Sequence, residues 1–116
     1  MSERFDFHTH TVASDGALTP TELVRAAAAN HVTAFALTDH DTTLGWAQAS
    51  DAARAHGIRL VPGIEVSCSR RGKSIHLLAY LPDPDDADLV TDLARARVSR
   101  DTRLDRMVAL MAADGI

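Results

Sequence analysis

The chain has 116 residues, of which 46% are apolar, a formal net charge of −4 and one cysteine, Cys68. The length suits one ordinary domain, and the mild acidity argues against a broad surface for duplex nucleic acid, because such surfaces are usually strongly basic. No apolar run reaches the ~20 residues of a membrane helix, the N-terminus lacks signal-peptide features and Cys68 cannot form an internal disulfide, so we expect a cytoplasmic protein without a membrane span.

The first predicted elements are a strand and a capped helix. A short strand is expected over residues 4–8, and a loop follows over residues 9–18. A helix should begin at the end of this loop, because Thr19 can cap it, Pro20 fits its first position and Glu22 can close a capping box. The chain therefore opens with a strand–loop–helix unit.

A second strand–helix pair and a third strand are predicted next. Residues 32–38 are apolar enough for a strand that is buried on both faces. Residues 41–43 offer caps for a second helix, which Gly57 is placed to stop in a left-handed conformation. A third strand is expected over residues 58–66. Helical crossovers between these strands are typical of parallel pairing.

The remaining elements are a strand and a helical segment. A basic turn at residues 70–73 precedes a fourth strand over residues 74–81, which the prolines of segment 82–86 should end. The order β-α-β-α-β-β indicates an α/β fold with a parallel sheet or barrel. From there on, apolar residues fall at helical spacing, which predicts one long helix or two. We place a domain boundary here, giving domains of residues 1–85 and 86–116.

The strongest functional signal is a pair of histidines, His8 and His10, at the end of the first strand. Strand side chains alternate with a period of two, so both imidazoles project to the same side, where one metal ion can bind both. Later strands also deliver a histidine or a carboxylate near their carboxyl ends, where parallel α/β folds place their chemistry. The candidate metal ligands are His8, His10, Asp15, His40, Glu65 and His76.

Structural interpretations compete with metal binding at these positions. A lone histidine is more often a hydrogen-bonded core residue than a ligand. Asp39 or Asp41 can accept a hydrogen bond from the ring of His40 and fix its tautomer, and Asp41 can also cap the second helix. Glu65 would be costly to bury without a partner, which a bridging metal supplies. A structural role is expected for His31, His56, Trp46 and Cys68, the last as a small buried residue.

Imidazole and carboxylate ligands together suit Mn²⁺, Zn²⁺ or Fe²⁺ without selecting among them. Six candidates exceed the needs of one tetrahedral ion, so two or more divalent ions are expected. Paired ions activate water and stabilise an in-line displacement at phosphorus, so hydrolysis of a phosphate ester, with no side chain as covalent nucleophile, is the expected reaction. The arginines after residue 90 are interpreted as a solvated helix face, of which Arg100 and Arg103 are candidates to bind a substrate anion.

As an ordered set, these motifs resemble the polymerase-and-histidinol-phosphatase (PHP) family. The resemblance implies the N-terminal portion of a distorted (β/α)₇ TIM-like barrel, followed by the start of a helical insertion at residues 86–116. It also implies that Glu65 bridges two ions, of which His8 and His10 hold one and His76 binds the other, while the remaining two candidates serve a further ion or its neighbour. The matching pieces are Asp6–Thr11, Ser14–Gly16, Thr38–Asp41, Pro62–Ser67 and His76–Tyr80.

Within the family, the chain is similar to small stand-alone phosphoesterases that act on 3′,5′-nucleoside bisphosphates or on short RNA. The implied partner is therefore a phosphorylated small molecule or a short oligonucleotide. The family's later motifs, a further His and a final Asp-x-His, do not occur before Ile116, so we expect a fragment of a longer protein or a truncated relative, and catalysis that needs the missing ligands. Two alternatives stay open: an amidohydrolase-type metal hydrolase, and a non-catalytic PHP module that supports a polymerase or another partner.

Overall fold

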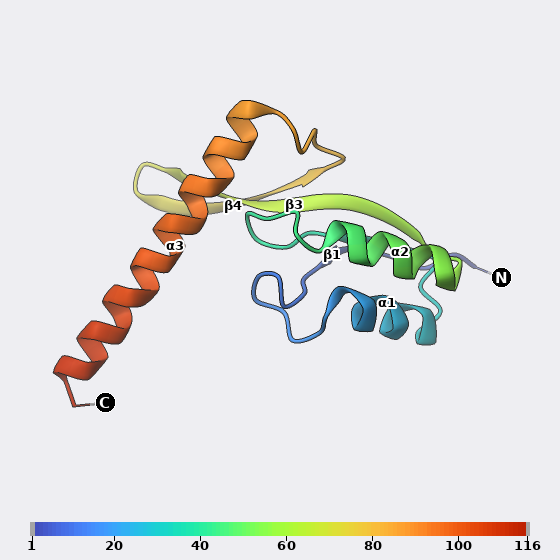
Figure 1. The fold of residues 1–116 in the computed structure, drawn as a ribbon, viewed down its shortest axis with the longest axis horizontal. Helices are drawn as coiled ribbons and strands as arrows, with labels where there is room; N and C mark the ends of the chain where they lie inside the picture. The colour runs from blue at the N-terminus through green and yellow to red at the C-terminus, as the bar shows by residue number, and fades with distance from the viewer. Residues whose placement is uncertain (1, 116) are drawn as a thin grey trace. The chain divides into compact units, whose positions relative to one another are not determined.

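The computed structural model describes residues 2–115, and the chain divides into two compact units, Met1–Pro84 and Asp85–Ile116. The first unit contains a four-stranded sheet in the order β1-β2-β3-β4 and two helices, α1 and α2 (Figure 1). The second unit contains one helix, α3 (Ala87–Ala113), which the Asp86 side chain caps. The protein is therefore an α/β protein, as its pattern of elements predicts.

The sheet is part parallel and part antiparallel. β1 (Phe5–Thr9) pairs with β2 (Ala34–Leu37), and β2 pairs with the first part of β3 (Arg59–Arg70), both in parallel. β4 (Lys73–Tyr80) pairs with β3 in the antiparallel sense, so the expectation of a parallel sheet is wrong for the last strand. The two turn residues 71–72 both have positive φ, at 52° and 76°. This conformation suits a two-residue hairpin turn, and such a short turn can join only antiparallel strands.

Helix α1 (Pro20–Ala29) begins as its sequence predicts. The Thr19 hydroxyl accepts a hydrogen bond from the Glu22 N–H, and the Glu22 carboxylate accepts one from the Thr19 N–H, which completes the capping box. Helix α2 (Trp46–His56) ends as predicted, because Gly57 adopts the left-handed conformation with φ 68°.

The predicted start of α2 is wrong. The helix begins at Trp46, and its N-cap residue, Gly45, makes no side-chain hydrogen bond. Residues 41–43 lie in an irregular segment before it. The Asp41 carboxylate does not cap this helix but accepts the backbone N–H of Ser67. The Asp41 carboxylate therefore accepts a long-range hydrogen bond from β3 and not the local hydrogen bond of a helix cap.

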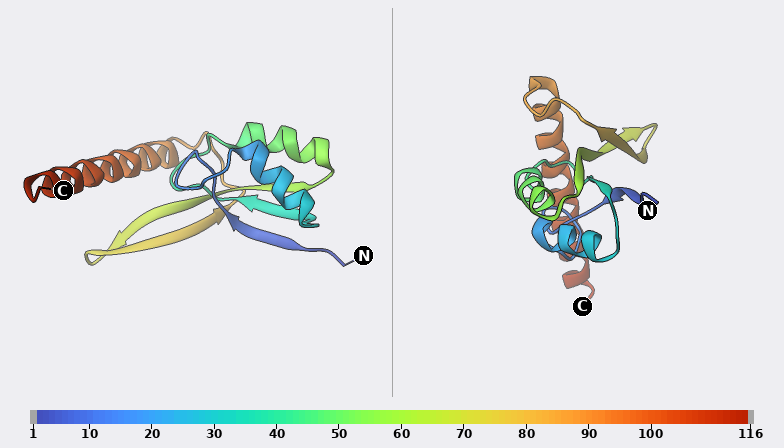
Figure 2. Two further views of the ribbon diagram at one scale, coloured as in Figure 1. Left: turned by 90° about the horizontal axis from the view of Figure 1, so that it is seen from below. Right: turned by 90° about the vertical axis from the view of Figure 1, so that its right-hand side faces the viewer.

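The core lies between the sheet and the two helices, which cover the same face of the sheet (Figure 2). β2 is buried throughout, as predicted, and Trp46 packs against the core and donates its indole N–H to the Gly63 carbonyl at 3.0 Å. Cys68, by contrast, is only half-buried, because it lies on the part of β3 beyond the helices. The buried core residues are Val24, Phe35, Leu37, Ala49, Ala53 and Ile58.

The opposite face of the sheet is not covered by α1 or α2 and is curled (Figure 2). The Tyr80 hydroxyl donates to the Phe7 carbonyl at 2.7 Å, and the two rings lie 6.4 Å apart. Because β1 and β4 are the two edges of the sheet, this bond joins them across the curled face. Among residues 2–115, no helix combines the length and the apolar character that crossing a membrane requires.

Candidate metal centre

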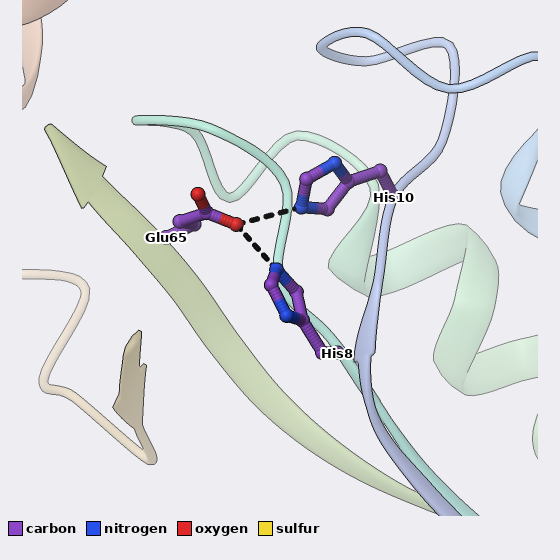
Figure 3. A group of neighbouring side chains, drawn as sticks. All are labelled: His8, His10 and Glu65. Carbon is purple, nitrogen blue, oxygen red and sulfur yellow. Dashed lines mark hydrogen bonds and ion pairs between the residues drawn. The ribbon is translucent and has the colours of Figure 1, made fainter. Parts of the chain in front are cut away.

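His8 of β1 and His10, which directly follows the end of β1, converge on one carboxylate. His8 Nε2 lies 2.5 Å and His10 Nε2 lies 2.9 Å from the same oxygen, Glu65 Oε1 (Figure 3). The pairing of β1 with β2 shifts register between Asp6 and Thr9, a stretch that contains His8 and lies just before His10. The expectation that both imidazoles project to one side is confirmed, and their common target is a residue 55 positions away from His10.

Glu65 occupies the centre of the cluster. Its backbone continues the β2–β3 pairing beyond the end of β2: the Glu65 N–H donates to the Asp39 carbonyl at 3.1 Å, and the Asp41 N–H donates to the Glu65 carbonyl at 3.2 Å. This bridge places His40 beside Glu65. The second oxygen, Glu65 Oε2, lies 2.8 Å from His76 Nδ1 and 3.6 Å from His40 Nδ1. One buried carboxylate thus faces four imidazoles.

Asp15 closes the other side of the cluster. Its Oδ1 lies 2.7 Å from His10 Nδ1, and its Oδ2 lies 3.1 Å from His40 Nε2. Asp15 is therefore more than a turn residue, because each of its oxygens faces a different imidazole. His10 and His40 in turn each face both carboxylates of the cluster.

The structure brings all six candidate ligands together. Within each group of three, the ligand atoms lie within 4.8 Å of one another. Ligands that share one ion at metal–ligand distances of about 2.0–2.2 Å lie roughly 3–4 Å apart, so the spacing fits divalent ions. The donor set, imidazole nitrogens with carboxylate oxygens, is also one that such ions accept. The three overlapping groups are His8–His10–Glu65, His10–Asp15–His40 and His40–Glu65–His76.

The cluster is electrostatically prepared for cations. Burial raises the pKa of Glu65, but hydrogen bonds with His8 and His10 and the charges of the neighbouring imidazoles outweigh this and lower the pKa to about 2. At Asp15, burial again raises the pKa, and the hydrogen bond with His10 and the charge of His40 bring it below its ordinary value. Both carboxylates are therefore ionised at neutral pH, the form in which a carboxylate binds a metal.

Asp39 holds the loop that carries Asp15. Its side chain is buried, and its Oδ1 accepts the Thr11 N–H at 2.6 Å and the Ser14 hydroxyl at 2.7 Å. Its Oδ2 accepts the Thr11 hydroxyl at 2.6 Å. The hydrogen bonds described for the Asp39 carboxylate thus go to the β1–α1 loop. The partner suggested from the sequence was instead the ring of His40. Thr11 and Ser14 were not singled out as site residues from the sequence.

The same loop is closed by a close approach of backbones. The N–H groups of Ser14 and Gly16 both donate to the Thr11 carbonyl, at 3.1 and 2.8 Å. A Cβ at Gly16 would lie 2.6 Å from the carbonyl carbon and oxygen of His10. Only glycine fits here without moving the backbone that carries a candidate ligand, so Gly16 belongs to the support of the site.

Asp41 supports the other side of the cluster. Beyond the bridge between His40 and Glu65, no further backbone pairing with the β2 side is described for β3. The Asp41 carboxylate accepts the Ser67 N–H at 2.7 Å, and so takes the place of the next carbonyl in the β2–β3 ladder. Asp41 is fully buried and has φ 57°, a conformation that aspartate tolerates better than most residues. The carboxylates on either side of His40 therefore hold two different neighbouring segments.

Other candidates lie outside the cluster. His31 follows α1 with φ 62°, and His56 is the last residue of α2; neither belongs to the three groups, in keeping with the structural role expected for them. Arg100 and Arg103 lie on α3, in the second unit. Their contact with substrate stays a prediction.

Comparison with known proteins gives a consistent result. Residues 6–108 match the PHP domain family. The chain is 42% identical over 111 residues to a 3′,5′-nucleoside bisphosphate phosphatase of Chromobacterium violaceum, covering 96% of this chain and 39% of that protein. It is 39% identical over 103 residues to a 5′-3′ exoribonuclease of Haemophilus influenzae, covering 89% of this chain and 38% of that protein.

A solved structure has the same fold over the matched residues. A protein from Bifidobacterium adolescentis, described as a metal-dependent phosphoesterase, superposes with a TM-score of 0.91 at 36% identity. The match covers 98% of this chain and 40% of that one. The chain thus spans about 40% of the length of the curated relatives and of the solved structure that it matches.

Proposed function

This chain belongs to the PHP domain family, and we propose that it carries the metal-binding part of a phosphoesterase that hydrolyses phosphate esters of the nucleotide or short-RNA type, such as 3′,5′-nucleoside bisphosphates. One observation carries the proposal: six ligand-type side chains from separate elements meet in three overlapping groups. The activities named for the two relatives support the substrate class. The barrel of seven β/α units is part of the same proposal.

The ligand assignment follows the three groups. Glu65 would lie between one ion held by His8 and His10 and a second held with His76. The group of His10, Asp15 and His40 would hold a third. We propose two or three divalent ions, Mn²⁺, Zn²⁺ or Fe²⁺, which suit this donor set. When bound, such ions supply Lewis acidity at phosphorus and an activated water.

The protein's own groups prepare this chemistry. Glu65 and Asp15, with lowered pKa values, offer negative charge at neutral pH without a proton to displace. His8 and Asp15 have side chains that are 53% and 54% exposed, so the cluster is open to a substrate from solvent. Cys68 lies three positions from Glu65 on the same strand, and so on the opposite face, which leaves it out of the reaction.

Metal content is the primary test of this chain, because the chain spans about 40% of its relatives. We expect at least one ion per chain by elemental analysis after loading with Mn²⁺ or Zn²⁺ and desalting. His10→Ala should abolish tight uptake, because His10 contacts both carboxylates. His56→Ala, at the end of α2, should leave uptake unchanged. Less than one ion per chain, or equal effects of the two changes, would contradict the ligand assignment.

Turnover tests the reaction class at the level of the whole protein. A chromogenic phosphodiester should be hydrolysed with added Mn²⁺, and His10→Ala should remove this activity. Metal uptake without any turnover would favour a non-catalytic PHP module. Hydrolysis of a hydantoin or an amide in place of the phosphodiester would favour an amidohydrolase.

A further inference from the structure

The β3–β4 hairpin extends well beyond the metal centre. The two strands pair without interruption from Gly63–Tyr80 to Arg70–Lys73, whereas β2 pairs with β3 only as far as Pro62 (Figure 2). At roughly 3.3 Å per residue, the tip lies about 17 Å along the strand from Glu65. Residues 69–76 are exposed, so packing within residues 2–115 does not account for this length.

One face of the hairpin continues the metal centre with hydroxyl groups. Ser67 and Ser69 alternate with Glu65 along β3 and therefore lie on the same face. Their cross-strand partners on that face are His76, a candidate ligand, and Ser74. Hydroxyl side chains are common hydrogen-bond donors to phosphate oxygens. A row of serines thus leads from the candidate ligands toward the tip.

The tip itself is a cluster of cations. Arg70, Arg71 and Lys73 are exposed, and no acidic residue occurs between Glu65 and Asp83. No ion pair described within residues 2–115 involves any of the three.

Three other arginines lie beside carboxylates. Arg54, Arg59 and Arg95 lie 3.8, 3.1 and 3.2 Å from carboxylates. In a chain with a net charge of −4, the hairpin tip therefore concentrates positive charge that remains open to an external anion.

We propose that this hairpin is a binding track for the phosphate backbone of a single-stranded oligonucleotide whose scissile phosphate lies at the metal centre. The inference rests on the proposed function and makes the substrate a chain of several nucleotides. A single nucleotide at Glu65 would not reach the tip, whereas an extended strand would place successive phosphates along the serines and against the cations. Charge complementarity between a polyanion and unpaired lysine and arginine supplies the affinity.

The test removes the three charges while preserving the turn. The hairpin variant is Arg70→Gln/Arg71→Asn/Lys73→Gln. Arg71 has positive φ, and Asn followed by Gly is the preferred pair for a two-residue hairpin turn, so this change should not unfold the hairpin. A matched control, Arg25→Gln/Arg54→Gln/Arg59→Gln, makes the same change in net charge at exposed sites on α1, α2 and the far end of β3.

The measurement is the fluorescence anisotropy of a labelled single-stranded RNA octamer in EDTA at 50 and 200 mM salt. If three phosphates are neutralised, each releasing about 0.7 counterions, this fourfold rise in salt weakens binding by about 20-fold. We expect that loss for the unmodified chain and for the control. The hairpin variant should bind at least about 10-fold more weakly at 50 mM salt and respond little to the salt.

Two outcomes would overturn the proposal: equal binding by the hairpin variant and the control, or binding of a duplex octamer as tight as that of the single strand. EDTA keeps this test separate from the metal chemistry. The hairpin variant should still take up Mn²⁺ like the unmodified chain. A chain that binds the octamer through the hairpin but takes up no metal would refute the proposed function and the placement of the scissile phosphate, and would leave only the hairpin's binding of the phosphate backbone.

Discussion

The two faces of the sheet do different work. On the helix-covered face, Val24, Phe35 and Leu37 are at most 1% exposed and pack into one apolar core. On the uncovered side, the His8 and His76 side chains are 53% and 47% exposed, yet they converge on one buried carboxylate. Stability and candidate chemistry therefore lie on opposite faces of the sheet. Apolar burial on one face maintains the backbone, and hydrogen bonds on the other face position the candidate ligands.

The largest expected effect comes from breaking the helix-covered face. Phe35→Ala removes a fully buried ring between β2 and the helices and should cost about 3–5 kcal/mol of unfolding free energy. Urea denaturation followed by circular dichroism measures the loss. Phe35→Leu, which leaves a smaller cavity, serves as the milder variant. Metal uptake per folded molecule should be unchanged in both variants. If folded Phe35→Leu bound less metal than the unmodified chain, the two faces would be coupled.

The converse change acts on the open face. Glu65→Gln keeps the size of the side chain but removes the charge that faces four imidazoles, so metal affinity should fall by at least about 100-fold. Isothermal titration with Mn²⁺ measures it. The control is Glu3→Gln, an exposed residue paired with Arg59, which should bind metal normally. Equal affinities of the two variants would remove Glu65 from the site.

Asp39 is buried like the core residues, but its hydrogen bonds hold the loop that carries Asp15 on the open face. Asp39→Ala would leave the donors of Thr11 and Ser14 without their acceptor, at a cost of about 1–3 kcal/mol. Hydrogen exchange should rise in the β1–α1 loop, and the ion assigned to Asp15 and His40 should be lost before the others. Asp39→Asn, which keeps one acceptor oxygen, and Ser14→Ala, which removes one donor, should show smaller losses. Full metal content in Asp39→Ala would contradict this positioning role.

The smallest expected effect is a dependence of metal-free stability on pH. The pKa of Glu65 is about 2 in the folded chain and 4.5 ordinarily. Since the folded value is lowered, the contribution of Glu65 is complete above pH 4.5 and is lost as the pH falls through about 2. The difference in urea midpoint between the unmodified chain and Glu65→Gln should therefore shrink over this range. A constant difference would mean that Glu65 carries no such linkage.

Much of the candidate site could be predicted because its signals are local. A spacing of two residues predicts His8 and His10 on one side of the backbone, and they face the same carboxylate although His10 lies just beyond the end of β1. The cap of α1 at Thr19 and the stop of α2 at Gly57 depend only on neighbouring backbone groups. Signals of this kind are complete within a few residues.

The start of α2 and the direction of β4 were not predicted, because each depends on a choice between alternatives. Asp41 could cap a helix or complete a ladder, and only the proximity of Ser67 decided the second. The order of elements favours parallel pairing, but the two-residue turn at residues 71–72, with its positive φ values, joins β3 and β4 as an antiparallel hairpin.

From the sequence alone it was possible to name the candidate ligands, the burial of β2 and the helical character of the last segment. Only the tertiary structure decided that Glu65 lies among four imidazoles and that Asp39 and Asp41 hold the loop and the strand on either side of them. The reason is physical. Periodicity and capping act within one element. The partners of a buried carboxylate, in contrast, are the N–H and O–H groups that other segments of the folded chain bring near it, as Thr11 and Ser14 are for Asp39 and Ser67 is for Asp41.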